Sequence, residues 1–156
     1  MTLPASFPLS MSQIATELGL SLPLSINHPW VIALAGKSAL PVSFSDLLGK
    51  SGRWDGAATA VSLPGGVSIQ SINAAFFGGV ISYAIFVTFG NANQFEIGFS
   101  SPPNYSGNLK IFNNTDSTTS AVLTKTNSTT WDSATGLSNN VIVLGVNKSY
   151  TILPST

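Results

Sequence analysis

The stretch "VISYAIFVTF" (residues 80–89), followed closely by "QFEIGFS" (residues 94–100), decides the fold class. The first stretch is rich in β-branched and aromatic residues and is long enough to cross the centre of a sheet. In the second, Phe95, Ile97 and Phe99 alternate with polar or small residues such as Glu96, which is typical of a strand with one buried face. Two such neighbours predict a mainly β protein.

The same region raises the alternative of a membrane-spanning helix, because no charged residue occurs between Ala57 and Phe95. A helix needs about 20 apolar residues to cross a bilayer. Polar residues interrupt this stretch on both sides: Gln70, Ser71 and Asn73 before it, and Asn91, Asn93 and Gln94 after it. No Lys or Arg flanks it either, so buried strands are the favoured interpretation.

Further strand patterns occur on both sides of residues 80–100. Short β-rich runs separated by turn residues occupy residues 59–63, 67–72, 108–112, 120–126, 141–146 and 149–153. Asn147-Lys148 is the expected hairpin turn between the last two runs. Eight or so short strands predict an antiparallel β-sandwich or jelly-roll.

The first third of the chain has a helical pattern, and a short helical N-terminal segment is expected to precede the sandwich. A similar short motif occurs three times, as "PLSMSQI", "PLSINHPW" and "PVSFSDL", starting at Pro8, Pro23 and Pro41. Each copy resembles the N-terminal start of a helix, with Pro before an aliphatic residue and then a capping side chain. The expected pairs are Ser10 with Gln13, Asn27 with Pro29, and Ser43 with Asp46, and the expected ends are Gly19, Gly36 and Gly49.

The glycine-rich stretch "GKSGRWDG" (residues 49–56) marks the seam between the two parts. We therefore expect a docking segment over residues 1–56 and a β-sandwich domain over residues 57–156. Helices this short are marginal in water and must pack on one another, on the sheet or on another chain. The apolar residues that we expect to be buried against a partner are Trp30, Ile32, Leu34, Phe44, Leu47 and Leu48. A helical cap that serves this chain alone is the competing interpretation.

Composition limits the classes of partner. Only 8% of the residues are charged, and six basic residues balance six acidic ones. Such a chain has no basic stripe for nucleic acid and no polybasic anchor for a membrane surface. Low charge also gives little protection against association, which favours a protein that lives in an assembly with copies of itself.

Candidates for chemistry are few. His28 is the only histidine and there is no cysteine, so no catalytic, metal or cofactor site is predicted. Asp116, Asp132 and Glu96 could in principle serve a glycosidase, but no paired-carboxylate pattern favours this over a place in turns or on a solvated strand face. Tyr105 and Trp131 lie in polar, loop-like settings, where aromatic rings either stack on sugars or fold back over the sandwich.

The phrases "PLSMSQIATELG", "INHPWVIALAGK" and "PVSFSDLLGKSGRWDG" resemble phrases in tailed-bacteriophage virion proteins, particularly small tail or tail-tip proteins. The resemblance covers about residues 8–56. It implies a non-enzymatic structural subunit, made in the host cytoplasm and located in the virion, whose N-terminal part contacts other virion proteins while the β-domain faces outward. Two alternatives stay open: a receptor- or carbohydrate-binding module for a host surface glycan, with Tyr105 and Trp131 as stacking residues, and a capsid decoration protein.

Overall fold

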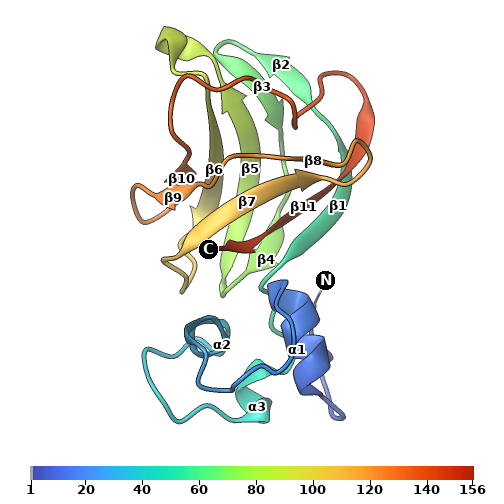
Figure 1. The fold of residues 1–156 in the computed structure, drawn as a ribbon, viewed down its shortest axis with the longest axis vertical. Coiled ribbons are helices and arrows are strands. Elements are labelled where there is room, and N and C mark those ends of the chain that lie inside the picture. The colour runs from blue at the N-terminus through green and yellow to red at the C-terminus, as the bar shows by residue number, and fades with distance from the viewer. Residues whose placement is uncertain (1) are drawn as a thin grey trace.

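A computed structural model describes residues 2–156 of the chain. Two antiparallel sheets pack face to face, and three short helices lie together beyond one end of the sandwich (Figure 1). The mainly β class and the preceding helical segment are thus as the sequence predicts. No helix within residues 2–156 combines the length and apolar character that a bilayer crossing demands.

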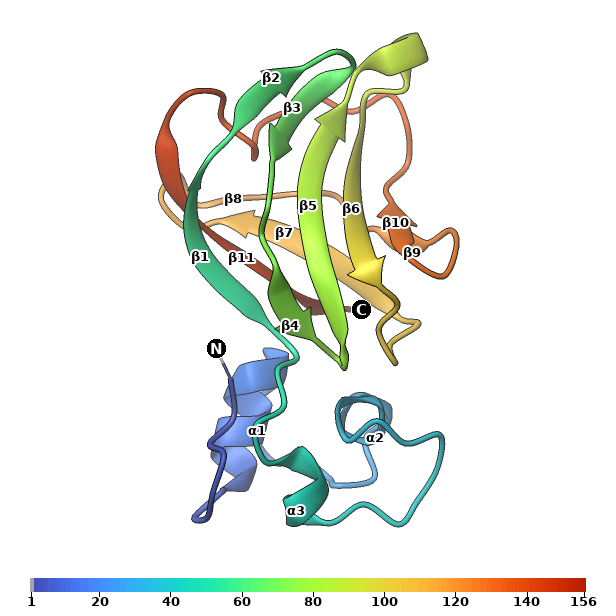
Figure 2. The same cartoon turned by 180° about the vertical axis from the view of Figure 1, so that it is seen from behind.

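The larger sheet has seven strands, and its outer face is turned toward the viewer in Figure 2. Its order is β2 (Val61–Leu63), β3 (Gly66–Ile69), β5 (Gly79–Val87), β6 (Gln94–Ser101), β10 (Thr130–Asp132) and β9 (Thr124–Lys125), and β4 (Ala74–Phe76) also pairs with β5. The two stretches that decided the fold class are β5 and β6, which pair with each other at the centre of this sheet.

The smaller sheet has four strands and brings the two halves of the chain together. Its order is β1 (Trp54–Thr59), β11 (Asn147–Ser155), β7 (Asn108–Asn113) and β8 (Thr118–Thr119). The last strand therefore lies between the first strand and β7. This arrangement needs contacts between residues about a hundred positions apart, which single-strand patterns cannot specify.

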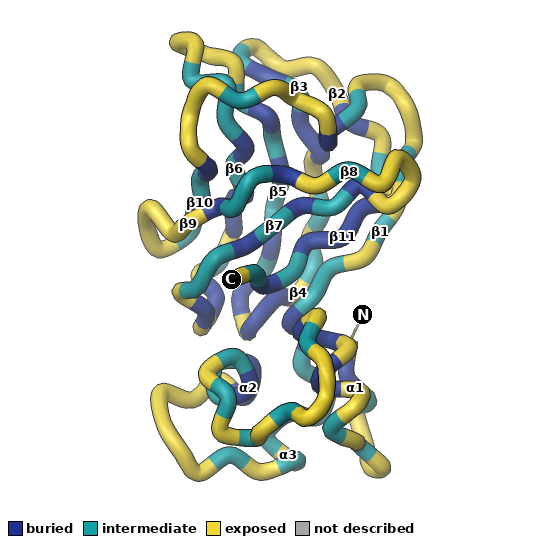
Figure 3. The backbone as a smooth tube through the Cα atoms, viewed as in Figure 1, coloured by how far each residue is buried: buried dark blue, intermediate teal, exposed yellow. Residues whose placement is uncertain are grey.

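The core lies between the sheets and continues toward the helices, where buried residues reach the lower end of the sandwich (Figure 3). The alternation in β6 turns Phe95, Ile97 and Phe99 inward, as predicted. Phe99 packs against Trp131 of β10, with 5.0 Å between ring centroids.

The three helices are α1 (Met11–Leu18), α2 (Pro29–Leu34) and α3 (Phe44–Leu47). Two caps are as predicted: Ser10 and Ser43 each form a reciprocal capping box with the residue three positions on. The predicted cap Asn27 is wrong. His28 caps α2 instead, because its Nδ1 accepts the Trp30 amide N–H at 3.2 Å.

The predicted strand over residues 141–146 and the hairpin turn at Asn147-Lys148 are also wrong. Asn147 and Lys148 are the first residues of β11. Residues 141 and 142 are buried in a loop, where the Asn139 side chain accepts both of their amide N–H groups. An apolar run can fill a core from a loop when a side chain satisfies its backbone.

The first strand of the sandwich, β1, begins at Trp54, three residues before the β-sandwich domain expected over residues 57–156. The two parts also share one core. A Cβ added at Gly52 would lie 3.0–3.2 Å from the side chains of Leu18, Leu34 and Phe77, which belong to α1, α2 and the turn after β4. The helical segment is therefore packed against the sandwich and is not connected to it by a flexible linker alone.

Candidate functional site

The three helix starts share a feature that the predicted capping pairs do not include. The residue before each repeat proline is apolar and exposed: Phe7 at 59%, Leu22 at 56% and Leu40 at 49%. Each of the three peptide bonds to proline is cis. The prolines themselves are exposed as well. We call Phe7, Leu22 and Leu40 the apolar triad.

Hydrogen bonds hold the backbone turn at the first and third helix starts. In the first, the Ser10 amide donates to Gln13 Oε1 at 2.8 Å. In the third, the Ser43 amide donates to Asp46 Oδ2 at 2.8 Å. The Lys37 ammonium also donates to Asp46 at 2.7 Å, and these hydrogen bonds lower the pKa of Asp46 to about 2.

The six predicted partner contacts divide into two groups. Leu34 and Leu47 are fully buried in the core of this chain, so they offer no surface to a partner, and that part of the expectation is corrected. The other four, Trp30, Ile32, Phe44 and Leu48, are half-buried. Trp30 packs edge-on against Tyr105, with ring centroids 6.2 Å apart, which ties α2 to the sandwich.

The helical segment is also tied to the sandwich by a buried carboxylate. Glu17 of α1 accepts the backbone N–H groups of Gly52 at 2.8 Å and Arg53 at 3.1 Å through Oε1. Its second oxygen, Oε2, is buried and has no hydrogen-bond partner among residues 2–156. Burial is the main cause that raises the pKa of Glu17 above its usual 4.5. Sequence patterns gave no sign of this contact, since they place Glu17 only as a polar residue near the end of a helix.

The two predicted stacking residues have no exposed ring. Trp131 is fully buried, its indole N–H donates to the carbonyl of Gly107 at 2.8 Å, and the Lys125 ammonium lies over its ring. Tyr105 is 2% exposed and its hydroxyl donates to the carbonyl of Asn108 at 2.9 Å. Of the two interpretations left open for these rings, the burial agrees with the one in which they fold back into the sandwich, and it leaves no ring face for a sugar to stack on.

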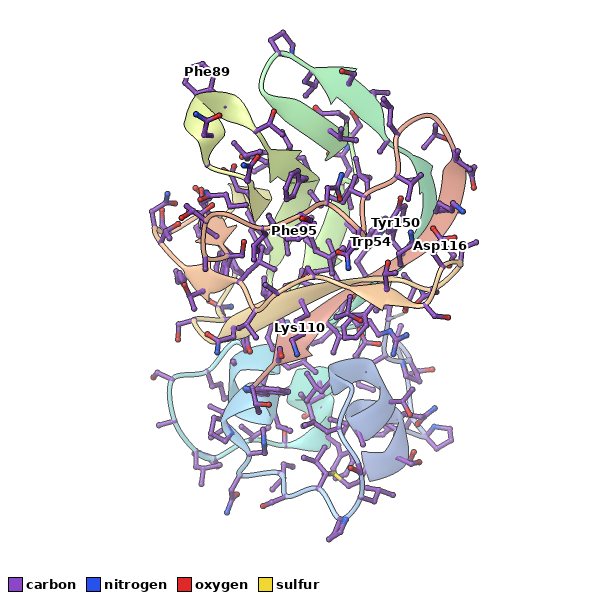
Figure 4. The ribbon with its side chains drawn as sticks, turned by 45° about the horizontal axis from the view of Figure 1, so that its top comes forward. Trp54, Phe89, Phe95, Lys110, Asp116 and Tyr150 are labelled. Carbon is purple, nitrogen blue, oxygen red and sulfur yellow. The ribbon has the colours of Figure 1, made fainter. Side chains whose placement is uncertain are left out.

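A surface groove lies elsewhere, on the outer face of the seven-stranded sheet. It has a volume of about 360 Å³, and its lining includes Leu63, Tyr83, Val87, Phe89 and Glu96. Phe89 stands on the short 3₁₀ turn η1 (Phe89–Asn91), at the end of the sandwich away from the helices (Figures 1 and 4). It is 79% exposed.

The outward face of β5 explains why sequence reading missed this groove. Tyr83, Ile85 and Val87 line the groove, whereas Ala84 and Phe86 between them are buried in the core. The alternation was present in the sequence, but apolar residues on both faces concealed it. A useful signal would have been the single tyrosine among aliphatic neighbours on a central strand.

The carboxylates considered for catalysis are placed as follows. Glu96 and Asp132 lie directly opposite each other on β6 and β10, and Asp116 forms an ion pair with Lys148 at 2.7 Å, in a turn after β7. Within residues 2–156, no three His, Cys, Asp or Glu side chains gather as a metal ion would require. His28 serves as a helix cap.

Comparison with known proteins adds no family to this description: no protein-family model, curated protein or solved structure matches the chain.

Proposed function

We propose that this chain is a non-enzymatic structural subunit of a larger assembly, docked through its helical segment, with the β-sandwich directed away from the contact. The resemblance of residues 8–56 to tailed-bacteriophage virion proteins makes a virion, and its tail or tail tip, the proposed assembly. The observation that carries the proposal is the apolar triad, three large exposed side chains at equivalent positions of a sequence motif that occurs three times.

Repetition of an exposed apolar residue at the same step of a motif supports a function for it. Single exposed apolar residues are common and need no explanation. Here Phe7, Leu22 and Leu40 each precede the proline of a capped helix entry, although folding of this chain buries none of them. Their side chains are available for contact with another protein.

The charge of the segment indicates what kind of surface fits it. Residues 1–50 contain only four charged side chains, Glu17, Lys37, Asp46 and Lys50. Glu17 is buried, and Lys37 and Asp46 form an ion pair at 2.7 Å. Lys50 alone is left to attract an opposite charge, so a complementary partner is mainly an uncharged, apolar protein surface, since a charged one would lose solvation with at most one ion pair to gain.

The test replaces the triad by serine, as Phe7→Ser, Leu22→Ser and Leu40→Ser together, in the gene that supplies the particles. Complete burial of one such side chain contributes about 1.5–3 kcal/mol, and about half of each is already covered in this chain. The three together then contribute about 3 kcal/mol, or roughly a hundredfold in affinity. We expect the variant to fold, as far-ultraviolet circular dichroism would report, and to be lost from sedimented particles.

A matched control uses three exposed apolar residues of the sandwich, as Val61→Ser, Leu144→Ser and Val146→Ser. These side chains are 43–51% exposed, close to the range of the triad. We expect this variant to enter particles normally. Normal incorporation of the triad variant, or equal loss of both variants, would refute docking through the helical segment.

A further inference from the structure

The groove on the outer face of the seven-stranded sheet is divided into an apolar half and a polar half. Leu63, Pro64, Val87 and Phe89 gather at the end formed by the β2–β3 turn and η1. The pairing register confirms the placement, because Leu63 is opposite Gly66 and Gly66 is in turn opposite Val87. Side chains opposite one another across an antiparallel pair lie on the same face of the sheet.

The polar half lies further along the strands. Gln70, Tyr83 and Glu96 line it. The Tyr83 hydroxyl donates to Glu96 Oε1, and the Gln70 side-chain amide donates to the Ser68 hydroxyl. These contacts hold the side chains in place while leaving Glu96 Oε2 and Gln70 Oε1 as acceptors that a ligand could use.

A glycine on β6 shapes this half of the groove. A Cβ at Gly98 would lie 2.2 Å from Cε1 of Tyr83, so the tyrosine ring lies directly over the backbone of its neighbouring strand. Only glycine leaves room for the ring there. The combination fixes an aromatic ring and a carboxylate side by side on a rigid sheet, as a preformed binding site requires.

We propose that this groove binds a neutral saccharide, with the apolar C–H face of a sugar ring against Phe89 and Val87 and its hydroxyl groups toward Glu96 and Gln70. A pyranose has one apolar face and a rim of hydroxyl groups, which matches the division of the groove. Hydroxyl groups donate to the two acceptors and accept from the remaining amide hydrogen of Gln70. The volume of about 360 Å³ is in the range of small-molecule sites.

The charges around the groove select among sugars. Glu96 lies directly opposite Asp132 across β6 and β10, and none of the described residues that line the groove is Lys or Arg. Two neighbouring carboxylates repel an anionic sugar. A basic peptide would gain from the same charges, but a single ammonium group would leave Gln70 without a partner, so the polyhydroxylated ligand is favoured.

This site is independent of docking, because all the residues that line it belong to the sandwich and none to the helical segment. Two of the elements that contribute to it, the β2–β3 turn and η1, lie at the end of the sandwich away from the helices (Figure 2). The test is amide chemical-shift perturbation of the ¹⁵N-labelled full chain. The probes are neutral hexoses, N-acetylhexosamines and their disaccharides at millimolar concentration, with galacturonic acid and a lysine-rich peptide as the charged comparisons. We expect shifts confined to the groove residues for at least one neutral sugar, and none for galacturonic acid.

Two variants locate the binding. Phe89→Ala removes an exposed ring and should raise the Kd at least tenfold, and Glu96→Gln should raise it similarly while keeping an acceptor for Tyr83. The control Leu144→Ala changes another exposed apolar side chain, which lies outside the groove, and should leave the Kd unchanged. The proposal is wrong if no neutral sugar perturbs the groove, if Phe89→Ala binds normally, or if the peptide or galacturonic acid alone binds.

Discussion

Replacement of Glu17 tests how firmly the helical segment is joined to the sandwich. Its Oε1 accepts the amide N–H groups of Gly52 and Arg53, which lead into β1. In Glu17→Ala the buried N–H of Gly52 and the half-buried N–H of Arg53 lose this acceptor. An unsatisfied buried donor costs about 1–3 kcal/mol, so the loss at Gly52 alone should lower the free energy of unfolding by about 1–3 kcal/mol. Urea denaturation followed by circular dichroism measures this loss.

Glu17→Gln separates the charge from the hydrogen bonds, because the amide oxygen can accept the same two N–H groups. Burial raises the pKa of Glu17 in the folded chain above 4.5, so the folded state holds the proton more tightly than the unfolded state. The resulting stability is fully present below pH 4.5 and is lost as the pH rises through the folded pKa. Each unit of difference between the two pKa values corresponds to about 1.4 kcal/mol.

We therefore expect Glu17→Gln to match the original chain in acid and to become the more stable of the two as the pH rises. Asp46→Asn is the control, because the stability that Asp46 contributes should depend on pH in the opposite direction. Hydrogen bonds from Lys37 and Ser43 lower the pKa of Asp46 to about 2, so the stability that Asp46 contributes to the fold is present above pH 3.8 and lost as the pH falls through about 2.

A cost below about 0.5 kcal/mol for Glu17→Ala would refute the reasoning, since that is the effect of an ordinary surface substitution. A pH slope of the opposite sign for Glu17→Gln would refute it equally.

Two further predictions concern the sandwich. Trp131→Phe should lower the free energy of unfolding by about 2–4 kcal/mol in urea denaturation, because it leaves a cavity and an unpaired Gly107 carbonyl; a loss below 1 kcal/mol would mean that the ring is not part of the core. Lys148→Met should raise the pKa of Asp116 toward 3.8 in an NMR titration, since the hydrogen bond from Lys148 is the main cause that lowers it. An unchanged Asp116 pKa would contradict the ion pair.

The sequence predicted those features that depend on neighbouring residues. The capping boxes at Ser10 and Ser43 need only a spacing of three, and the inward face of β6 needs only alternation. His28 was missed as a cap because an imidazole nitrogen is an uncommon acceptor at a helix start. Residues 141–146 were misread because a buried apolar loop and a short strand have the same composition.

The candidate sites were harder to predict because they depend on contacts between distant segments. Leu47 and Trp131 resembled surface residues only while their neighbours were unknown, and both are fully buried. The apolar triad escaped notice because each repeat was taken to begin at its proline, one residue too late. The groove required the register that brings β5, β6 and the β2–β3 turn together, which no single stretch contains.

An electron cryomicroscopy map of the proposed parent virion is the most direct test of docking through the helical segment. The sandwich and the three helices are distinct enough in shape to orient the chain even in a map of modest resolution (Figure 1). We predict density for the helices, including Phe7, Leu22 and Leu40, against an apolar surface of a neighbouring subunit, with the sandwich pointing away. A chain held by its sandwich with the helices free, or no density for the chain in the particle, would contradict the proposal.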